Sequence, residues 1–83
     1  MKVHIRYFAS IRESLGQGAE TVETAAATLA VLREELIARG GAYAESLARG
    51  RAVRVALNQA MSEESAALAD GAEVAFFPPV TGG

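Results

Sequence analysis

The stretch TLAVLREELIARGG, residues 28–41, decides the fold. Its large apolar side chains recur at i, i+3, i+7 and i+8, which places them on one face of a helix. They are Leu29, Leu32, Leu36 and Ile37. Thr28 is a residue type that caps helices, two glycines end the stretch, and Glu35 and Arg39 have the i, i+4 spacing of an ion pair. We therefore expect one main helix whose apolar face needs a sheet to cover it.

Segments that alternate between apolar and polar residues lie on both sides of this helix. In residues 2–8 one face carries Val3, Ile5 and Tyr7, and the other carries His4, Arg6 and Phe8. This period of two is typical of a half-buried strand. Residues 52–57 and 73–77 are expected to form two more strands. Shorter strands are expected at residues 20–23 and around Met61, which follows a turn at Asn58-Gln59.

Two short helical segments complete the expected secondary structure. Ser10 and Glu13 have the spacing of a capping box, which predicts a short helix over residues 10–15. A helical turn is expected over residues 42–47.

This order of elements predicts an α+β fold with a mixed sheet and one main helix packed across it, the β-grasp or ubiquitin-like arrangement. The first and last strands of such a fold are parallel neighbours. We expect one domain over residues 1–77 and an extended C-terminal tail over residues 78–83, which ends in Gly-Gly.

The composition excludes several classes of protein. A length of 83 residues allows one small domain, and 8 Lys+Arg against 10 Asp+Glu argue against a nucleic-acid partner. Cysteine is absent, which excludes disulfides, thiolate metal sites and cysteine nucleophiles. No apolar run approaches the ~18 residues of a membrane span, so a cytoplasmic protein with no membrane partner is expected.

The sequence offers few groups for catalysis or metal binding. His4 is the one histidine, it falls on the outer face of the first strand, and no further ligand lies at a suitable spacing. The carboxylates of Glu34-Glu35 and Glu63-Glu64 are expected in solvent. We therefore expect no metal site and no enzyme that acts on its own.

The end of the chain is its most informative segment, and it reads Pro78-Pro79-Val80-Thr81-Gly82-Gly83. Two residues without a Cβ can thread a narrow channel and carry an α-carboxylate into the active site of another protein. A free carboxylate is inert as an acyl donor, so activation as an acyl-adenylate by a separate ATP-using enzyme is expected. Because cysteine is absent, sulfur on this chain would have to sit on the terminal carbonyl as a thiocarboxylate.

Apolar residues are also expected on the outer face of the sheet. Phe8 shares the face of His4 and Arg6, and Phe77 falls out of phase with the inward residues of the last strand. Parallel pairing of the two strands would place Phe8 and Phe77 in one patch, which Met61 extends. Arg6 and Arg54 would form its rim, and an apolar centre with an arginine edge is typical of a protein interface. A one-residue bulge would instead turn either phenylalanine inward.

These residues resemble the small subunits of molybdopterin synthase. The likeness is most specific in residues 70–83, DGAEVAFFPPVTGG. The start of the chain, with Tyr7-Phe8-Ala9 before Ile11-Arg12-Glu13, and the turn Leu57-Asn58-Gln59 are similar as well.

The resemblance implies a sulfur carrier that binds no cofactor itself. Gly83, preceded by Gly82, would be adenylated by an E1-like enzyme that uses ATP, and a sulfurtransferase would provide sulfur for a thiocarboxylate. The tail, including Pro78, Pro79, Val80 and Thr81, would enter the large subunit of molybdopterin synthase and deliver sulfur to cyclic pyranopterin monophosphate. The contact surface of the family falls on Phe8, Met61 and Phe77.

Two alternatives stay open at this stage. The first is carrier chemistry with another acceptor, such as tRNA thiolation, thiamine thiazole synthesis or conjugation to protein lysines. The second is a non-covalent β-grasp interaction module whose tail is incidental.

Overall fold

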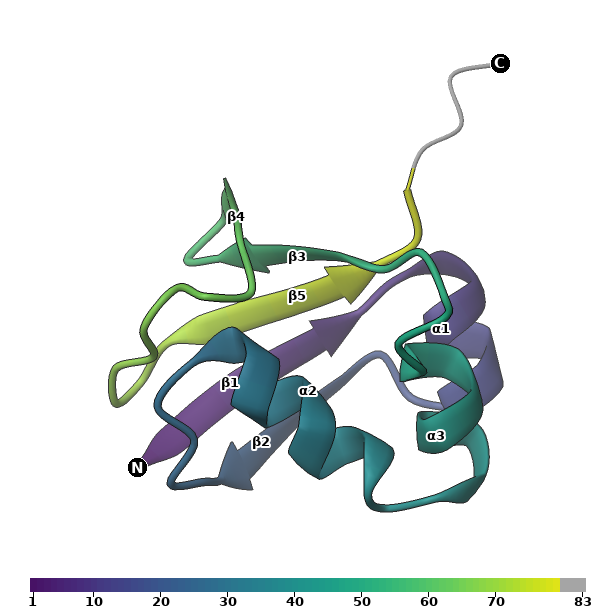
Figure 1. The fold of residues 1–83 in the computed structure, drawn as a ribbon, viewed down its shortest axis with the longest axis horizontal. Helices are drawn as coiled ribbons and strands as arrows, with labels where there is room; N and C mark the ends of the chain where they lie inside the picture. The colour runs from purple at the N-terminus through teal and green to yellow at the C-terminus, as the bar shows by residue number, and fades with distance from the viewer. Residues whose placement is uncertain (80–83) are drawn as a thin grey trace.

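The computed structural model describes residues 1–79 and has the expected β-grasp architecture (Figure 1). Its elements are β1 (Lys2–Tyr7), α1 (Ala9–Leu15), β2 (Ala19–Glu23), α2 (Leu29–Ile37), α3 (Gly41–Leu47), β3 (Arg54–Leu57), β4 (Ala60–Ser62) and β5 (Glu73–Phe77). The five strands form one mixed sheet in the order β2-β1-β5-β3-β4. The predicted site residues Val80, Thr81, Gly82 and Gly83 lie outside the described residues.

The centre of the sheet is the parallel pair β1 and β5. Ile5 lies opposite Val74 and Tyr7 opposite Phe76, and all four side chains are buried. The β2 and β3 strands flank this pair, each antiparallel to its neighbour. The parallel pairing of the first and last strands is therefore confirmed, and both strands end at the same edge of the sheet.

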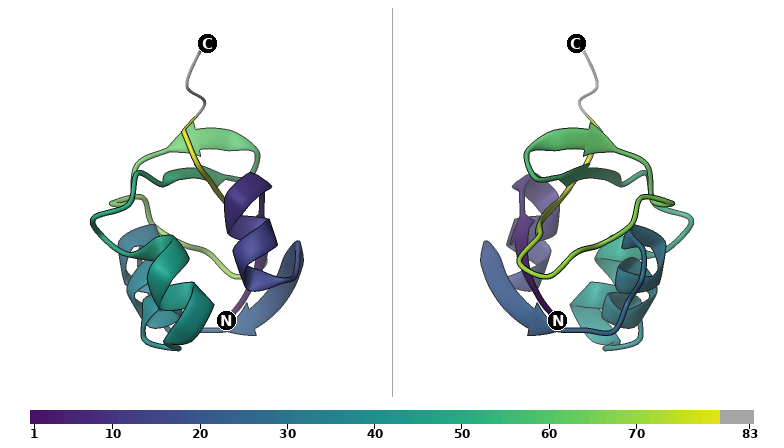
Figure 2. Two further views of the ribbon diagram at one scale, coloured as in Figure 1. Left: turned by 90° about the vertical axis from the view of Figure 1, so that its right-hand side faces the viewer. Right: turned by 90° about the vertical axis from the view of Figure 1, so that its left-hand side faces the viewer.

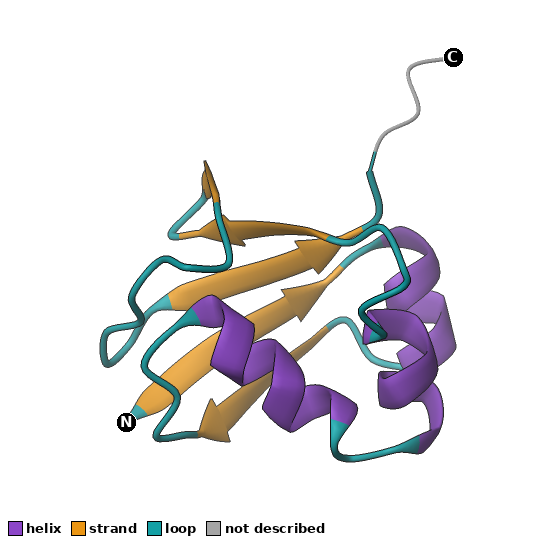
Figure 3. Cartoon of the chain, viewed as in Figure 1, coloured by secondary structure: helices purple, strands orange, loops and turns teal. Residues whose placement is uncertain are grey.

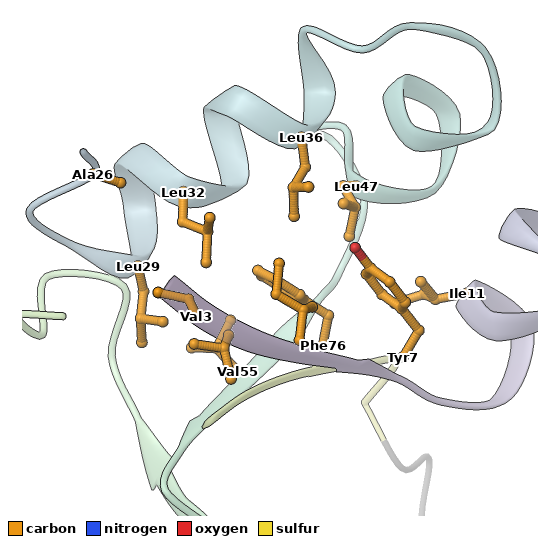
Figure 4. Packing of buried hydrophobic residues seen from close by; sticks show 12 residues of the cluster. Val3, Tyr7, Ile11, Ala26, Leu29, Leu32, Leu36, Leu47, Val55 and Phe76 are labelled. Carbon is orange, nitrogen blue, oxygen red and sulfur yellow. The ribbon is translucent and has the colours of Figure 1, made fainter. Parts of the chain in front are cut away.

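The core lies between one face of the sheet and the helices (Figure 4). The α2 helix contributes Leu29, Leu32 and Leu36, as its apolar spacing predicts, and Thr28 caps it by accepting a hydrogen bond from the Val31 amide at 3.3 Å. The shorter helices α1 and α3 add Ile11 and Leu47, respectively. The main helix thus covers the sheet together with two short ones.

The predicted capping box at Ser10 is wrong. The α1 helix begins at Ala9, its N-cap is Phe8, and no side chain provides a cap hydrogen bond. The backbone sets this start, because the Phe8 amide bonds to the Phe76 carbonyl at 3.2 Å and Ala9 takes a positive φ of 51°. Strand β1 therefore leads directly into the helix, and Ser10 lies inside its first turn.

The turn between β3 and β4 forms at Asn58-Gln59, as expected. Both residues have positive φ values, 51° and 70°, which suit the tight turn of a hairpin. The Asn58 side chain accepts a hydrogen bond from the Glu73 amide at 3.0 Å, which ties the hairpin to β5.

A carboxylate on β2 fastens the end of β1 to the helical layer. Glu20 accepts hydrogen bonds from the hydroxyls of Tyr7 and Tyr43, at 2.8 and 2.7 Å, and from Gln17 at 3.1 Å. Its other oxygen bonds to Arg39 at 2.9 Å. Burial alone would raise the pKa of Glu20, but the bonds from Tyr43, Arg39 and Tyr7 outweigh it and hold the pKa below its ordinary value.

This network overturns the ion pair expected within the main helix. Glu35 instead accepts a hydrogen bond from the Thr24 hydroxyl at 2.6 Å, and Arg39 turns to Glu20. A tertiary partner is stronger than an exposed i, i+4 neighbour because it is partly shielded from water.

Arg33 on α2 is buried and joins two other segments of the chain to this helix. Arg33 donates to the carbonyls of Leu47 and Ala48, at 2.7 and 2.8 Å, and to Glu64 at 2.8 Å. Its guanidinium thereby holds the end of α3 and the segment that follows β4 against the helix.

We expect Phe76→Ala to cost roughly 3–5 kcal/mol of unfolding free energy, because it opens a large cavity in the core. Phe76 is fully buried and stacks on Tyr7, with ring centroids 6.2 Å apart. Chemical denaturation monitored by circular dichroism measures the loss. A change below about 1 kcal/mol would contradict the assignment of Phe76 to the core.

Glu20→Gln should lower stability at neutral pH and flatten its dependence on acid. The lowered pKa of Glu20 means that its charge stabilises the fold above the unfolded pKa of about 4.3. That contribution is lost as the pH falls through the folded value. The melting temperature of the wild type should therefore fall more steeply below about pH 4 than that of the variant. Glu13→Gln, at an exposed position of α1, is the control, and an equal slope for wild type and Glu20→Gln would refute the role of Glu20.

Candidate functional site

The outer face of the sheet, opposite the core, carries a row of side chains that crosses four strands. Arg6 pairs with Ala75, Ala75 pairs with Ala56, and Ala56 pairs with Met61. Partners that lie directly opposite in a sheet project from the same face. The two central alanines are small and the side chains around them are large, so the surface is depressed over Ala75 and Ala56.

This depression belongs to a hollow of about 790 Å³, which we call the outer trough. Its lining consists of Arg6, Phe8, Ala9, Ala56, Gln59, Met61, Glu73, Ala75, Phe77, Pro78 and Pro79. Strand β4 lies on the side of the molecule away from the N-terminus (Figure 2), and the β3–β4 turn lies beside the start of β5, where Asn58 bonds to Glu73 and Leu57 lies opposite Val74. The trough therefore brings together residues from the start, the middle and the end of the chain.

The large apolar residues of the trough are open to solvent. Met61 is 65% exposed and Phe8 is 42% exposed, while Phe77 is half-buried. No bulge turns Phe8 or Phe77 inward, because the β1–β5 register runs unbroken up to the pair of Tyr7 and Phe76. A small domain needs most of its large apolar residues in the core, so apolar bulk gathered outside it indicates a surface for another protein.

The arginines expected at the rim take two positions. Arg6 lines the trough itself. Arg54 lies on the same face, opposite Phe77, but it lines a neighbouring hollow with Met61 and Glu63. Arg54 therefore stands beside the trough and not in its wall.

Pro78 and Pro79 connect the trough to the tail. They follow β5 directly, both are half-buried, and both line the trough. Proline fixes φ and has no N–H to donate, so the pair ends the pairing of β5 and stiffens the exit of the chain. The α1 helix lies at the same edge of the sheet, where β1 and β5 end (Figure 3). A partner that covers the trough would therefore contact Pro78 and Pro79, where the tail begins.

Side chains that could bind a metal ion are scattered in the described residues. His4 is exposed and its ring bonds to the Thr21 hydroxyl at 3.0 Å. Residues 1–79 contain no group of three or more His, Cys, Asp or Glu side chains that could hold a metal ion. Within the same residues, no helix has the length and apolar character that crossing a bilayer requires.

Some features of the site were not found from the sequence. Alternation along β5 and β3 places Ala75 and Ala56 outward, but it gives no reason to expect a hollow, because depth depends on four strands at once. Ala9 begins α1 and Gln59 lies in the β3–β4 turn, so the alternation of a strand applies to neither. Val31 on α2 is also exposed, at 45%, and it stands apart from the trough.

Together these features define a ubiquitin-like β-grasp protein whose outer sheet face carries a largely apolar hollow next to Pro78 and Pro79. Comparison with known proteins identifies it further. Residues 5–83 match the model of the ThiS family. The chain is 40% identical to the molybdopterin synthase sulfur carrier subunit of Haemophilus influenzae, over 98% of this chain and 99% of the relative.

Two solved structures have the same fold. A putative molybdopterin converting factor subunit 1 from Pyrococcus furiosus matches with a TM-score of 0.77 and 29% identity, over 96% of this chain and 99% of the other. The complex of subunits 1 and 2 of molybdopterin-converting factor from Helicobacter pylori contains a chain that matches with a TM-score of 0.69 and 27% identity, over 100% of both chains.

The chain therefore belongs to the ThiS family. Its function is that of a sulfur carrier subunit of molybdopterin synthase, in the biosynthesis of the molybdenum cofactor.

Proposed function

We propose that this chain carries sulfur as a thiocarboxylate on Gly83 and that the outer trough holds it on its partners. The observation that carries the proposal is the position of Pro78 and Pro79, which line the trough and lead directly into the last four residues. A partner seated on Phe8, Met61 and Phe77 would receive the tail at a defined point.

The chemistry follows from the absence of cysteine. The ionised carboxylate of Gly83 attacks the α-phosphorus of ATP on a separate E1-like enzyme and releases pyrophosphate. The terminal sulfur of a persulfide on a sulfurtransferase then attacks the acyl carbon and displaces AMP, which gives an acyl disulfide. A second thiol attacks the sulfurtransferase sulfur of this acyl disulfide, forms a disulfide with it and releases the thiocarboxylate. The chain itself provides no catalytic side chain, so its part is to present the terminal carbonyl.

The acceptor partner that we propose is the large subunit of molybdopterin synthase. The subunit pair in the Helicobacter pylori structure supports it. Residues 78–83, with Val80, Thr81 and Gly82 before Gly83, would enter the large subunit and deliver sulfur to cyclic pyranopterin monophosphate. Residues 1–77 would remain outside as the docking domain.

A reconstituted reaction tests the proposal. The chain with a C-terminal thiocarboxylate, mixed with the large subunit and cyclic pyranopterin monophosphate, should yield molybdopterin. The same chain with an ordinary carboxylate, or without Gly82-Gly83, should yield none. Product from the truncated chain would refute carriage on Gly83, and isopeptide adducts on lysines in place of product would favour a protein modifier.

Phe77→Ala should weaken association with the large subunit by about 1–3 kcal/mol, as is typical of an interface hot spot. The unfolding free energy of the variant should change little, because Phe77 points away from the core and is only half-buried. Calorimetric titration measures the affinity, and Phe76→Ala is the matched core variant on the neighbouring residue. Wild-type affinity for Phe77→Ala would remove Phe77 from the docking surface.

A further inference from the structure

Two arginines on the outer face have no acidic partner, and they indicate the chemistry of whatever covers the trough. Within residues 1–79, neither Arg6 nor Arg54 forms a salt bridge. On the helical side Arg33, Arg39 and Arg49 each pair with a glutamate. Arg12 on α1 and Arg51 after α3 also form no salt bridge within the described residues, so what sets Arg6 and Arg54 apart is their place on the outer face of the sheet.

Carboxylates lie near both arginines without pairing with them. Glu73 lines the trough that contains Arg6, and Glu63 lines the hollow that contains Arg54. No contact within 4.0 Å joins either pair in the described part of the chain. Both guanidinium groups are therefore available to a partner.

A partner that covers the trough would remove water from these guanidinium groups. Most of the surrounding surface is apolar, so it offers them few hydrogen bonds in return. A buried charge without a partner is strongly destabilising, whereas a carboxylate pairs with guanidinium through two parallel hydrogen bonds. Acidic side chains are thus the groups that the covering surface needs at these two points.

The sheet fixes the spacing of the two arginines along the backbone. Arg6 lies level with Ala75 on one side of β5, and Arg54 lies level with Phe77 on the other side. Two strand spacings of about 4.8 Å and an offset of two residues place their Cα atoms about 12 Å apart. The line between the two Cα atoms crosses β5 between Ala75 and Phe77.

We propose that the large subunit presents two carboxylates, one on either side of an apolar contact, to Arg6 and Arg54, whose Cα atoms lie about 12 Å apart. This inference rests on the proposed function, which names the large subunit as the partner. The competing view is that the arginine stems only extend the apolar surface while their charged ends stay in water. Leucine would then replace both arginines without loss.

The test measures the affinity of the full-length chain for the large subunit at 50 and 300 mM salt. Arg6→Glu with Arg54→Glu should weaken binding at least about 100-fold at low salt, because like charges would then face each other. Arg6→Leu with Arg54→Leu should also weaken binding and should reduce its salt dependence. Arg6→Lys with Arg54→Lys should retain most of the affinity at low salt.

Lys2→Glu is the matched control, since it reverses one charge on the same strand and the same face, at the far end from the tail. It should bind within about twofold of the wild type, because charges beyond a Debye length are screened. Circular dichroism checks that every variant folds.

The outcomes separate the two proposals. Wild-type affinity for the doubly reversed or the doubly leucine variant, with normal conversion of the pterin, would overturn the pairing and leave the proposed function intact. Failure of the wild-type chain to bind the large subunit or to support conversion would overturn both.

Discussion

The parallel pairing of β1 with β5 is the constraint on which the rest of the structure depends. Its register sends Tyr7 and Phe76 into the core and leaves Arg6 and Ala75 on the outer face. A slip of one residue would exchange the two faces of a strand. The same pairing therefore builds the core and places Arg6 and Ala75 in the outer trough, and it ends both strands at the edge of the sheet where Pro78 follows β5.

The two faces of the sheet have different roles in this chain of 83 residues. The core face is closed by α2 and by the Glu20 network, which fastens the end of β1 to β2 and to the helical layer. The outer face keeps its apolar and cationic groups open. Rigidity on one side means that little ordering is needed when a partner docks on the other.

Where the spacing of apolar residues decides burial, the sequence alone predicted which side chains face the core and which face outward. The inward positions of β1 and α2 were found in this way, and so were the outward positions of Phe8 and Phe77. Predictions of polar contacts failed where a distant residue competed with a near one. Arg39 pairs with Glu20, nineteen positions away, and not with Glu35. Ser10 does not cap α1, because β1 leads directly into the helix and the helix begins at Ala9.

The trough and the buried Arg33 could not have been found from spacing in a single sequence. The floor of the trough is formed by alanines that become neighbours only when β1, β5, β3 and β4 pair in one register. Arg33 is buried because α3 and the chain after β4 close over it with two carbonyls and a carboxylate. Both features depend on contacts between segments that are far apart in the chain.

The central claim is that the sulfur travels on the terminal carbonyl, and the intact mass of the chain tests it most directly. The chain is incubated with its activating enzyme, ATP and a sulfurtransferase, and accurate mass separates sulfur exchange from oxidation. If Gly83 carries the sulfur, the mass should rise by about 16 Da, the difference between sulfur and oxygen, and the gain should disappear when Gly83 is deleted. An unchanged mass, with the activating enzyme bound, would contradict this claim.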